Sequence, residues 1–350
     1  RVDSLGVSEP VVTKQGANQI VVELPAVHNV AQAAAIIGET AQLELYDLET
    51  SLVPPSIGAT QTPVATTSLY GLLASVQSGQ KGLPSAYYLF DSRAKKPVAG
   101  PFPTLAQLKA DTAVQELRPL RPSKKSSAPL KTTAGFPTGY QLMTVPGDRA
   151  VVTCDARSSV VCPGLAADPV AGVAYYYLFR HTSPDADQPV PQMTGKDLKL
   201  KGTQQDIDPS SGQPIVTLHF TSRGNKLFHE ITRAEAIRGQ TLGAPQHFAI
   251  VLDGKLRSFP YIDYQQNPDG IDPTGNGAQI TGLASATEAR NLALVLRSGA
   301  LRVPFRTVEQ TDVSATLGKD SLRQARDAAI GGLLLVAVFL LLLYRFIGLV

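Results

Sequence analysis

Residues 248–262 read FAIVLDGKLRSFPYI and carry the clearest local signal for the fold. Phe248–Leu252 is a continuous apolar run, and the Asp253-Gly254 pair that follows is typical of two-residue hairpin turns. The chain then returns through Lys255–Ile262 as a second strand. We therefore predict a β-hairpin here.

Strands and helices alternate on both sides of this hairpin, as the spacing of apolar residues indicates. Around it we expect strand Ile215–Phe220, helix Asn225–Ile237, strand Ala278–Thr281, helix Thr287–Ser298 and strand Val303–Glu309. Near the start we expect a hairpin of strands Val11–Lys14 and Ile20–Leu24, helix Val30–Thr40 with Asn29 as N-cap, and strand Leu43–Leu48. This pattern predicts an α+β domain with residues 1–52 as its first half and 191–318 as its second.

Residues 53–190 differ in composition and read as an inserted, β-rich lobe. Prolines occur at positions 54, 55, 63, 84, 97, 101 and 103, and such a shift marks a domain boundary or linker. The fragment Tyr-Tyr-Leu-Phe occurs at 87–90 and again at 176–179, each time predicting a strand. The two copies are candidates to pair in one small sheet.

Basic residues gather between these two copies, at Arg118, Arg121, Lys124, Lys125 and Lys131. One interpretation is a patch that binds lipid headgroups or a polyanion. The other is a solvated loop, which is favoured because the stretch has no periodic apolar residues and no interleaved aromatic residues.

The final 23 residues, Ala328–Val350, contain one charged side chain, Arg345, and predict a transmembrane helix. A helix of this length spans roughly 34 Å, enough for a hydrocarbon core of about 30 Å. Tyr344 and Arg345 suit the membrane interface, so we assign residues 319–350 to the helix and its approach. A buried core helix is the alternative, but it would need packing partners on every side.

Charge and cysteine content restrict the other possibilities. A net charge of +3 is too small to indicate a nucleic-acid partner. Cys154 and Cys162 are the only cysteines, and none of the five histidines has metal-ligand spacing beside them, so we expect no metal or cofactor. A disulfide between the two cysteines is favoured over two free thiols and indicates an extracytoplasmic compartment. The chain begins with Arg1 without a signal-peptide pattern, so we expect a segment of a longer protein.

Several strings together resemble one known family. They are LGVSEPVV (5–12), IVVELPAV (20–27), GETAQLELY (38–46), FTSRGNKLF (220–228), IVLDGKLRSFPYI (250–262), GAQITGLASATEARNLALVLRSGAL (277–301) and TLGKDSLRQA (316–325). In this order they closely resemble the SecD subunit of the bacterial SecDF preprotein-translocation accessory complex. AYYLFD (86–91) and KKPVAGP (95–101) also resemble that family's large periplasmic domain, whereas residues 118–135 match nothing in it.

The resemblance implies a ferredoxin-like base formed by the two flanks, a mobile head formed by the insert, and Ala328–Val350 as the second membrane helix. It places the protein in the cell (inner or plasma) membrane with its soluble part on the extracytoplasmic side. The positive-inside rule alone favours the opposite orientation, because Lys319, Arg323 and Arg326 precede the span. The cysteines and the resemblance together outweigh that bias.

The resemblance also implies a function and partners. The domain is expected to bind unfolded preprotein segments emerging from the SecYEG translocon, together with SecF and membrane lipid, and to promote export by head movement driven by the proton motive force. Candidate hinges lie where the chain crosses between base and head, at Leu52, Pro54, Pro55, Pro189 and Pro191. Candidate peptide contacts are the aromatic residues Tyr87, Tyr88, Tyr175, Tyr176 and Tyr177, although alternate rings are equally well explained as core.

Two other classes of function are alternatives. His219, His229, Glu230, Ser222 and Ser258 could in principle form a hydrolytic site, but the chain has no GxSxG, HExxH or phosphate-loop motif, so no enzyme is expected. The second is a single-pass membrane-anchored receptor or adhesin that binds an external ligand. It would share the anchor, the disulfide and the inserted lobe.

We predict that Cys154 and Cys162 are bonded in the protein isolated from its native membrane. Mass spectrometry of the non-reduced protein should find the two peptides linked, and the double Cys→Ala variant should lose about 2–3 kcal/mol of unfolding free energy because the closed loop is short. Free thiols in the isolated protein would contradict the expected oxidising compartment.

Overall fold

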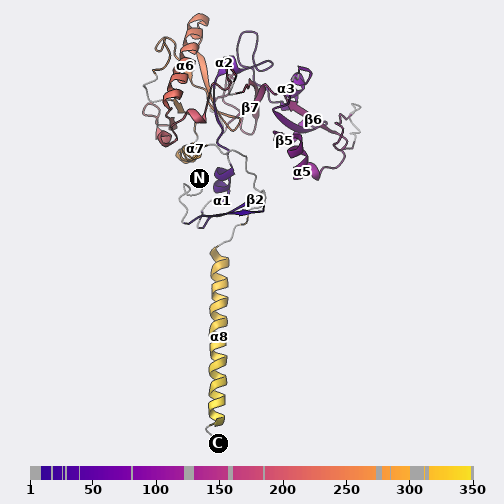
Figure 1. The fold of residues 1–350 in the computed structure, drawn as a ribbon, viewed down its shortest axis with the longest axis vertical. Coiled ribbons are helices and arrows are strands. Elements are labelled where there is room, and N and C mark those ends of the chain that lie inside the picture. Colours follow the sequence, from indigo (N-terminus) through magenta and orange to yellow (C-terminus); the bar gives the residue numbers. More distant parts are fainter. Residues whose placement is uncertain are drawn as a thin grey trace.

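The computed structural model describes residues 9–16, 19–25, 27, 30–38, 40–79, 82–121, 130–156, 161–183, 186–272, 278–283, 285–299, 311 and 315–347. It shows an α+β soluble part and a long C-terminal helix, α8 (Ala315–Ile347), which extends away from it (Figure 1). The predicted strand Val303–Glu309 and the N-cap Asn29 lie outside the described residues.

A seven-stranded sheet forms the centre of the soluble part. Its main path runs β8 (Ala174–Arg180), β7 (Arg149–Asp155), β13 (Lys255–Ser258), β12 (Gln246–Leu252), β3 (Leu43–Asp47) and β9 (Met193–Thr194). β14 (Tyr261–Ile262) also pairs with β12. The pairs are antiparallel except β13 with β7, which run parallel and meet at Lys255 and Thr153.

The predicted hairpin around Asp253-Gly254 is confirmed. Both turn residues have positive φ, 50° and 71°, the backbone that this dipeptide tolerates and that a tight turn between twisted strands requires. The Asp253 carboxylate also accepts hydrogen bonds from the Ala41 and Gln42 N–H groups at 3.1 and 2.9 Å, and from the Thr40 hydroxyl. The turn therefore holds the start of β3 beside β12.

Strand β12 is buried on both faces. Phe248, Ile250 and Leu252 point into a first hydrophobic core, whereas Ala249 and Val251 point into a second on the opposite face. Successive side chains of a strand point to opposite faces, so a strand covered on both sides reads as a continuous apolar run, as FAIVL does.

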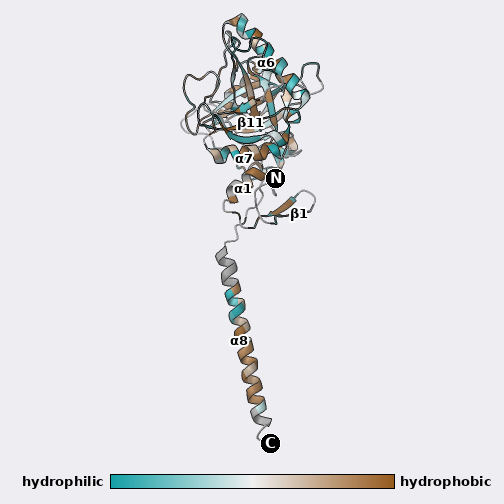
Figure 2. Ribbon diagram, turned by 90° about the vertical axis from the view of Figure 1, so that its left-hand side faces the viewer, coloured by the Kyte–Doolittle hydropathy of each residue, from teal (hydrophilic) through white to brown (hydrophobic). Residues whose placement is uncertain are grey.

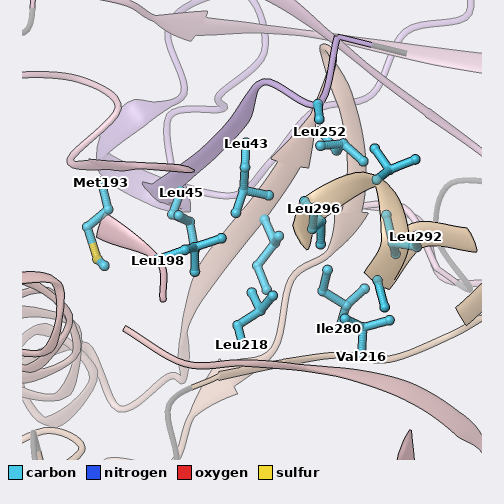
Figure 3. Close-up of a cluster of buried hydrophobic side chains, with 14 of the residues drawn as sticks. Leu43, Leu45, Met193, Leu198, Val216, Leu218, Leu252, Ile280, Leu292 and Leu296 are labelled. Carbon is cyan, nitrogen blue, oxygen red and sulfur yellow. The ribbon is translucent and has the colours of Figure 1, made fainter. Parts of the chain in front are cut away.

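The first core is covered by helices and a smaller sheet. The sheet contains β10 (Gln204–Ile207), β11 (Pro214–Leu218) and β15 (Ala278–Ile280), in that order. Helices α1 (Val30–Gly38), α6 (Ser222–Leu242) and α7 (Ala286–Arg297) supply further side chains. Figure 3 shows Leu43 and Leu45 of β3 on one side of this core and Val216 and Leu218 of β11 on the other.

Helix α6 begins and ends at residues suited to those positions. The Thr221 side chain accepts from the Gly224 N–H at 3.1 Å, and Gly243 at the C-terminal end has φ 64°. Gly224 has no room for a side chain, because a Cβ there would lie 2.4 Å from the Asp197 carbonyl oxygen. The helix is longer than the predicted Asn225–Ile237 at both ends.

A second three-stranded sheet builds a small lobe from residues 69–145. Its strands are ordered β5 (Lys96–Phe102), β4 (Ala86–Asp91) and β6 (Tyr140–Val145). Helix α3 (Leu69–Val76) packs on one face in a third core, and α4 (Leu105–Ala110) and α5 (Thr112–Gln115) pack on the other in a fourth. The third core also contains Leu178 of β8, so the small lobe packs directly on the central sheet.

The remaining elements are short. The predicted N-terminal hairpin is confirmed as β1 (Val11–Gln15) and β2 (Gln19–Glu23), whose side chains are mostly exposed. Helix α2 (Leu48–Ser51) follows β3 directly, and three 3₁₀ turns occur at Gln77–Gly79, Gly195–Asp197 and Leu200–Gly202.

The prediction that residues 53–190 form a lobe separate from the flanks is wrong in its extent. Strands β7 and β8 come from that segment, yet they lie in the same sheet as β3, β12 and β13 of the flanks. The second core mixes Tyr46 and Val251 of the flanks with Val152 and Phe179 of the insert. Residues 69–145, a smaller unit, have a sheet of their own.

Two further expectations differ from the structure. The Tyr-Tyr-Leu-Phe copies do not pair with each other, because one lies in β4 of the small lobe and the other in β8 of the central sheet. A ferredoxin-like base is not confirmed, because β11 and β12, which flank α6, belong to different sheets.

We expect Phe179→Ala to destabilise the soluble part by about 3–5 kcal/mol in a single cooperative transition. Phe179 is fully buried, and its ring centroid lies 5.0 Å from that of Tyr46 across the boundary between insert and flank. Urea unfolding of the full chain in detergent, followed by near-UV circular dichroism, measures this change. Val170→Ala, at an exposed position of the insert, is the control and should change stability by less than about 0.5 kcal/mol. Two separate transitions would show that insert and flanks fold independently.

Candidate functional site

A network of charged side chains lies buried between α6, α2 and the end of β3. The Asp47 carboxylate caps α2 by accepting from the Thr50 N–H at 3.5 Å, and it also accepts from Arg238 Nη2 at 2.6 Å. Arg238 belongs to α6, so this ion pair joins residues 191 positions apart in sequence. The Asp47 side chain is 8% exposed, which protects the pair from screening by solvent.

The network continues onto β12. The Glu49 carboxylate accepts from the His247 N–H at 3.0 Å, and its other oxygen lies 2.6 Å from His247 Nδ1. Arg238 Nε donates to Gln246 Oε1 at 3.3 Å. Together these bonds fix the C-terminal half of α6 against α2 and β12.

Glu235 is the unusual member of this network. Its side chain is completely buried, and neither carboxylate oxygen has a hydrogen-bond partner among the described residues. Burial raises the pKa of Glu235 well above its ordinary value, the nearby Asp47 and Glu49 carboxylates raise it further, and Arg238 opposes them. Glu235 therefore keeps its proton at pH values at which an exposed glutamate is ionised.

This arrangement can hold or release a proton. Burial also raises the pKa of Asp47, against the opposing effect of Arg238. Within the described ranges, no group of three or more His, Cys, Asp or Glu residues is placed to hold a metal ion. This network was not predicted from the sequence, although Glu235 follows Phe228 and Ile231 at helical spacing on an apolar face, and a carboxylate at that position is a usable signal.

The first predicted hinge is firmly bonded to β8. Leu52 is buried in the second core, and the Val53 N–H donates to the Leu178 carbonyl oxygen at 3.0 Å. The Ser56 hydroxyl oxygen accepts from the Leu178 N–H at 2.8 Å. Pro54 and Pro55 form an exposed turn between these contacts, so this crossing is not a free linker.

The second predicted hinge is fixed in a similar way. Val190, between Pro189 and Pro191, is buried, and its N–H donates to the Thr182 hydroxyl oxygen at 2.8 Å. Thr182 in turn donates its N–H to the Val190 carbonyl oxygen at 2.7 Å. The composition suggested flexibility here, but these hydrogen bonds tie the crossing to the residues that follow β8.

The five predicted peptide-contact tyrosines are part of the cores. Tyr88 and Tyr177 are 7% and 1% exposed, so neither presents its ring to a passing chain in this conformation. Tyr87, Tyr175 and Tyr176 are half-buried and pack against the fourth, second and third cores. The alternative in which these rings fill the interior fits the structure better.

Cys154 and Cys162 form a disulfide, with a sulfur–sulfur distance of 2.03 Å, and both are buried in the second core. The histidines considered for a hydrolytic site have structural contacts. His229 Nδ1 lies 2.8 Å from the Ile271 carbonyl oxygen, and the His219 carbonyl oxygen accepts from the Lys199 N–H at 2.7 Å.

Helix α8 contains a candidate membrane span, Leu322–Tyr344, which is long and apolar enough to cross a bilayer. None of it is buried against the rest of the chain, unlike a core helix. Figure 2 shows hydrophobic residues over most of this helix and a hydrophilic stretch near its start. Tyr344 is exposed, and the side chain of Arg345 lies outside the described residues.

Two family models match the chain. Residues 1–50 match the model for the N-terminal part of the P1 domain of the protein translocase subunit SecDF, and residues 180–303 match the model for the SecDF P1 head subdomain. The residues that match the head model, 180–303, lie mostly in the segment 191–318, which we expected to be the second half of the base. The segment that we expected to be the head, residues 53–190, overlaps that match only at its end.

Several known proteins that are similar in sequence to this chain are also described as protein translocase subunits. The protein translocase subunit SecD of Rhodothermus marinus is 29% identical over 362 residues, covering 100% of this chain and 51% of the relative. The SecD of Synechocystis is also 29% identical, covering 100% of this chain and 54% of the relative. The SecD of Acidaminococcus fermentans is 41% identical over 159 residues, which is 45% of this chain and 34% of the relative. The chain thus spans about half the length of the relatives that it matches throughout.

Solved SecDF structures are also similar. One, described as a membrane component that enhances protein export, is 23% identical with a TM-score of 0.40 and covers 89% of this chain and 88% of its own. Another, SecDF in a super-membrane-facing form, is 23% identical with a TM-score of 0.40 and covers 88% of this chain and 26% of its own.

We expect Glu235→Gln to stabilise the soluble part at neutral pH and to reduce the dependence of its stability on pH. Between the ordinary pKa of a glutamate, about 4.3, and the raised pKa of folded Glu235, the unfolded chain has lost a proton that the folded chain retains. Stability of the wild-type protein should therefore fall as pH rises through this window. Urea unfolding between about pH 4 and pH 8 measures the effect.

Glu230→Gln, on the exposed side of the same helix, is the matched control and should leave the pH profile unchanged. Parallel pH profiles for Glu235→Gln and the wild type would contradict the raised pKa.

Proposed function

Because the chain belongs to the SecD family of protein translocase subunits, we propose that it is an accessory part of a Sec protein-export machinery. In this proposal α8 anchors it in the cell membrane, its soluble part lies on the extracytoplasmic side, and SecF and the SecYEG translocon are its partners. The observation that supports it best is the agreement of two family models at separate parts of the chain with relatives aligned over its whole length. No step in this role requires catalysis by the chain.

We further propose that the soluble part binds emerging, unfolded preprotein and assists export by changing its orientation as the proton motive force is used. The moving body would be larger than the lobe expected from sequence. Strands from the insert and both flanks share one sheet, so most of residues 43–299 would turn together relative to α8.

An open strand edge is the most suitable place for an unfolded polypeptide, because main-chain hydrogen bonds recognise any sequence. The outer edge of β10 is such an open strand edge. The Ile207 N–H donates to the Asp206 carboxylate at 2.8 Å rather than to β11, and the Ile207 side chain is 61% exposed. No described strand pairs with this edge of β10.

The outer edges of β8, β6 and β5 are closed. Val53, Ser56 and Thr66 hydrogen-bond to the outer edge of β8. On the edge of β6, the Gln77 amide donates to the Thr144 carbonyl oxygen at 2.7 Å, and the Thr133 hydroxyl accepts from the Leu142 N–H at 2.9 Å. Edge strand β5 contains Pro97 and Pro101, which lack the N–H that an added strand would need.

Site-specific photocrosslinking in cells tests this proposal. A benzoylphenylalanine at position 207 should crosslink to an export substrate arrested during translocation, and one at Val170, exposed but outside any strand edge, should not. Deleting the gene should slow export, and the wild-type protein should restore it. Normal export without the protein would overturn the accessory role, whereas normal complementation without a crosslink at 207 would remove only the β10 contact.

A further inference from the structure

The small lobe is far more basic than the rest of the chain. Residues 69–145 contain ten Lys and Arg residues and three Asp and Glu residues, a net charge of +7, whereas the whole chain carries +3. All remaining residues together are therefore acidic. Such a separation of charge within one soluble unit indicates an anionic partner for the small lobe.

Five exposed cations surround one loop of this lobe, residues 134–139; we call Arg93, Lys109, Arg118, Arg121 and Lys131 the cation ring. Hydrogen bonds bring their segments to the loop. The Ser92 N–H, beside Arg93, donates to the Gly139 carbonyl oxygen at 2.9 Å. The Leu120 N–H, between Arg118 and Arg121, donates to the Thr138 carbonyl oxygen at 2.8 Å.

The two lysines reach the same loop. The Gly139 N–H donates to the hydroxyl of Thr132, the residue after Lys131, at 2.9 Å. Lys109 Nζ lies 6.0 Å from the centroid of the Phe136 ring. Four separate segments that carry these cations therefore meet at the loop.

Two neighbouring acids bind backbone N–H groups and form no ion pair with the ring. The Asp91 carboxylate accepts from the Arg93 and Ala94 backbone N–H groups at 2.8 and 2.9 Å, and Asp111 is buried, where it caps α5. Among the described residues, no carboxylate forms an ion pair with any of the five cations.

The surface lacks what a peptide-binding site needs. Among the described residues of the small lobe, Leu83 is the one large apolar side chain that is exposed, and it lies outside the segments that carry the cation ring. A peptide bound at the ring would therefore have no apolar anchor. Both edges of the lobe's sheet are closed to strand addition, β5 by prolines and β6 by Gln77 and Thr133. Long cationic side chains without an apolar anchor or an open strand edge suit an array of phosphates instead.

We propose that the cation ring binds the anionic phospholipid headgroups of the membrane in which α8 is anchored. Each Lys or Arg near such a surface contributes a modest attraction, and the tether keeps headgroups at high effective concentration. In Figure 1, α5 lies at the edge of the small lobe on the side from which α8 extends. The proposal depends on α8 spanning a membrane and not on the role in export.

The full chain reconstituted in lipid nanodiscs provides the test. Ala134→Cys places a single reactive thiol inside the ring, because both native cysteines form a disulfide. A fluorophore there should be quenched by spin-labelled headgroups severalfold more in discs containing phosphatidylglycerol than in discs of phosphatidylcholine. Raising the salt concentration about tenfold should remove the difference.

Two variants with equal changes in net charge distinguish an effect of the cation ring from an effect of the net charge of the protein. Neutralising Arg93, Lys109, Arg118, Arg121 and Lys131 to Gln should lower the ratio of lipid-bound to free lobe by ~100-fold or more. Neutralising five exposed cations elsewhere, Lys199, Lys201, Lys226, Arg233 and Arg297, should leave the quenching intact. The wild-type salt titration needs no substitution in the ring, so it remains valid if the ring variant misfolds.

Equal quenching in the two lipids would overturn the proposal, as would equal losses in the two variants. A response of the fluorophore at position 134 to polyglutamate, without a response to phosphatidylglycerol, would identify an acidic polypeptide as the partner and would also overturn it.

Discussion

The burial of β12 on both faces is the constraint on which the rest of the structure depends. Its alternate side chains fill two cores, and those cores take residues from both flanks and from the part of the insert that lies outside the small lobe. The Asp253-Gly254 turn fixes the end of the strand, and the Asp253 carboxylate also binds the backbone that leads into β3. A disturbance of β12 would therefore affect both cores at once.

Cores that share strands make the soluble part a single mechanical unit. Strand β8 places Tyr177 and Phe179 in the second core and Leu178 in the third, and β4 links the third core to the fourth in the same way. A lobe can rotate freely only where few contacts cross its boundary. Here the crossing segments at Val53 and Val190 are bonded to β8 or to the residues that follow it, so both entrances to the insert are held in place.

Local signals in the sequence predicted local structure well. The Asp-Gly hairpin, the helices α6 and α7 and the apolar C-terminal helix each follow from residues within one segment, and all are present. The predictions that differ from the structure concern the pairing of strands that are far apart in the sequence. Strand β7 meets β13 in parallel at a single residue pair, Thr153 with Lys255, which no periodicity reveals. The polar network around Glu235 was missed for the same reason, because its members come from β3, α2, α6 and β12. The proline-rich crossings suggested hinges because composition does not show tertiary hydrogen bonds.

If α8 anchors the chain in a membrane and the soluble part turns as one body, as proposed above, its surfaces change direction together. The cation ring lies in the small lobe and the open edge of β10 lies beyond the first core, and shared sheets and cores connect the two. If headgroups hold the ring, the direction of the β10 edge relative to the membrane is set at the same time. Electrostatic attraction to a surface is weak for each residue and sensitive to salt, so such a contact can form and break at little cost. Release of the ring would then reorient the whole body, and the edge strand with it, without any hinge inside the soluble part.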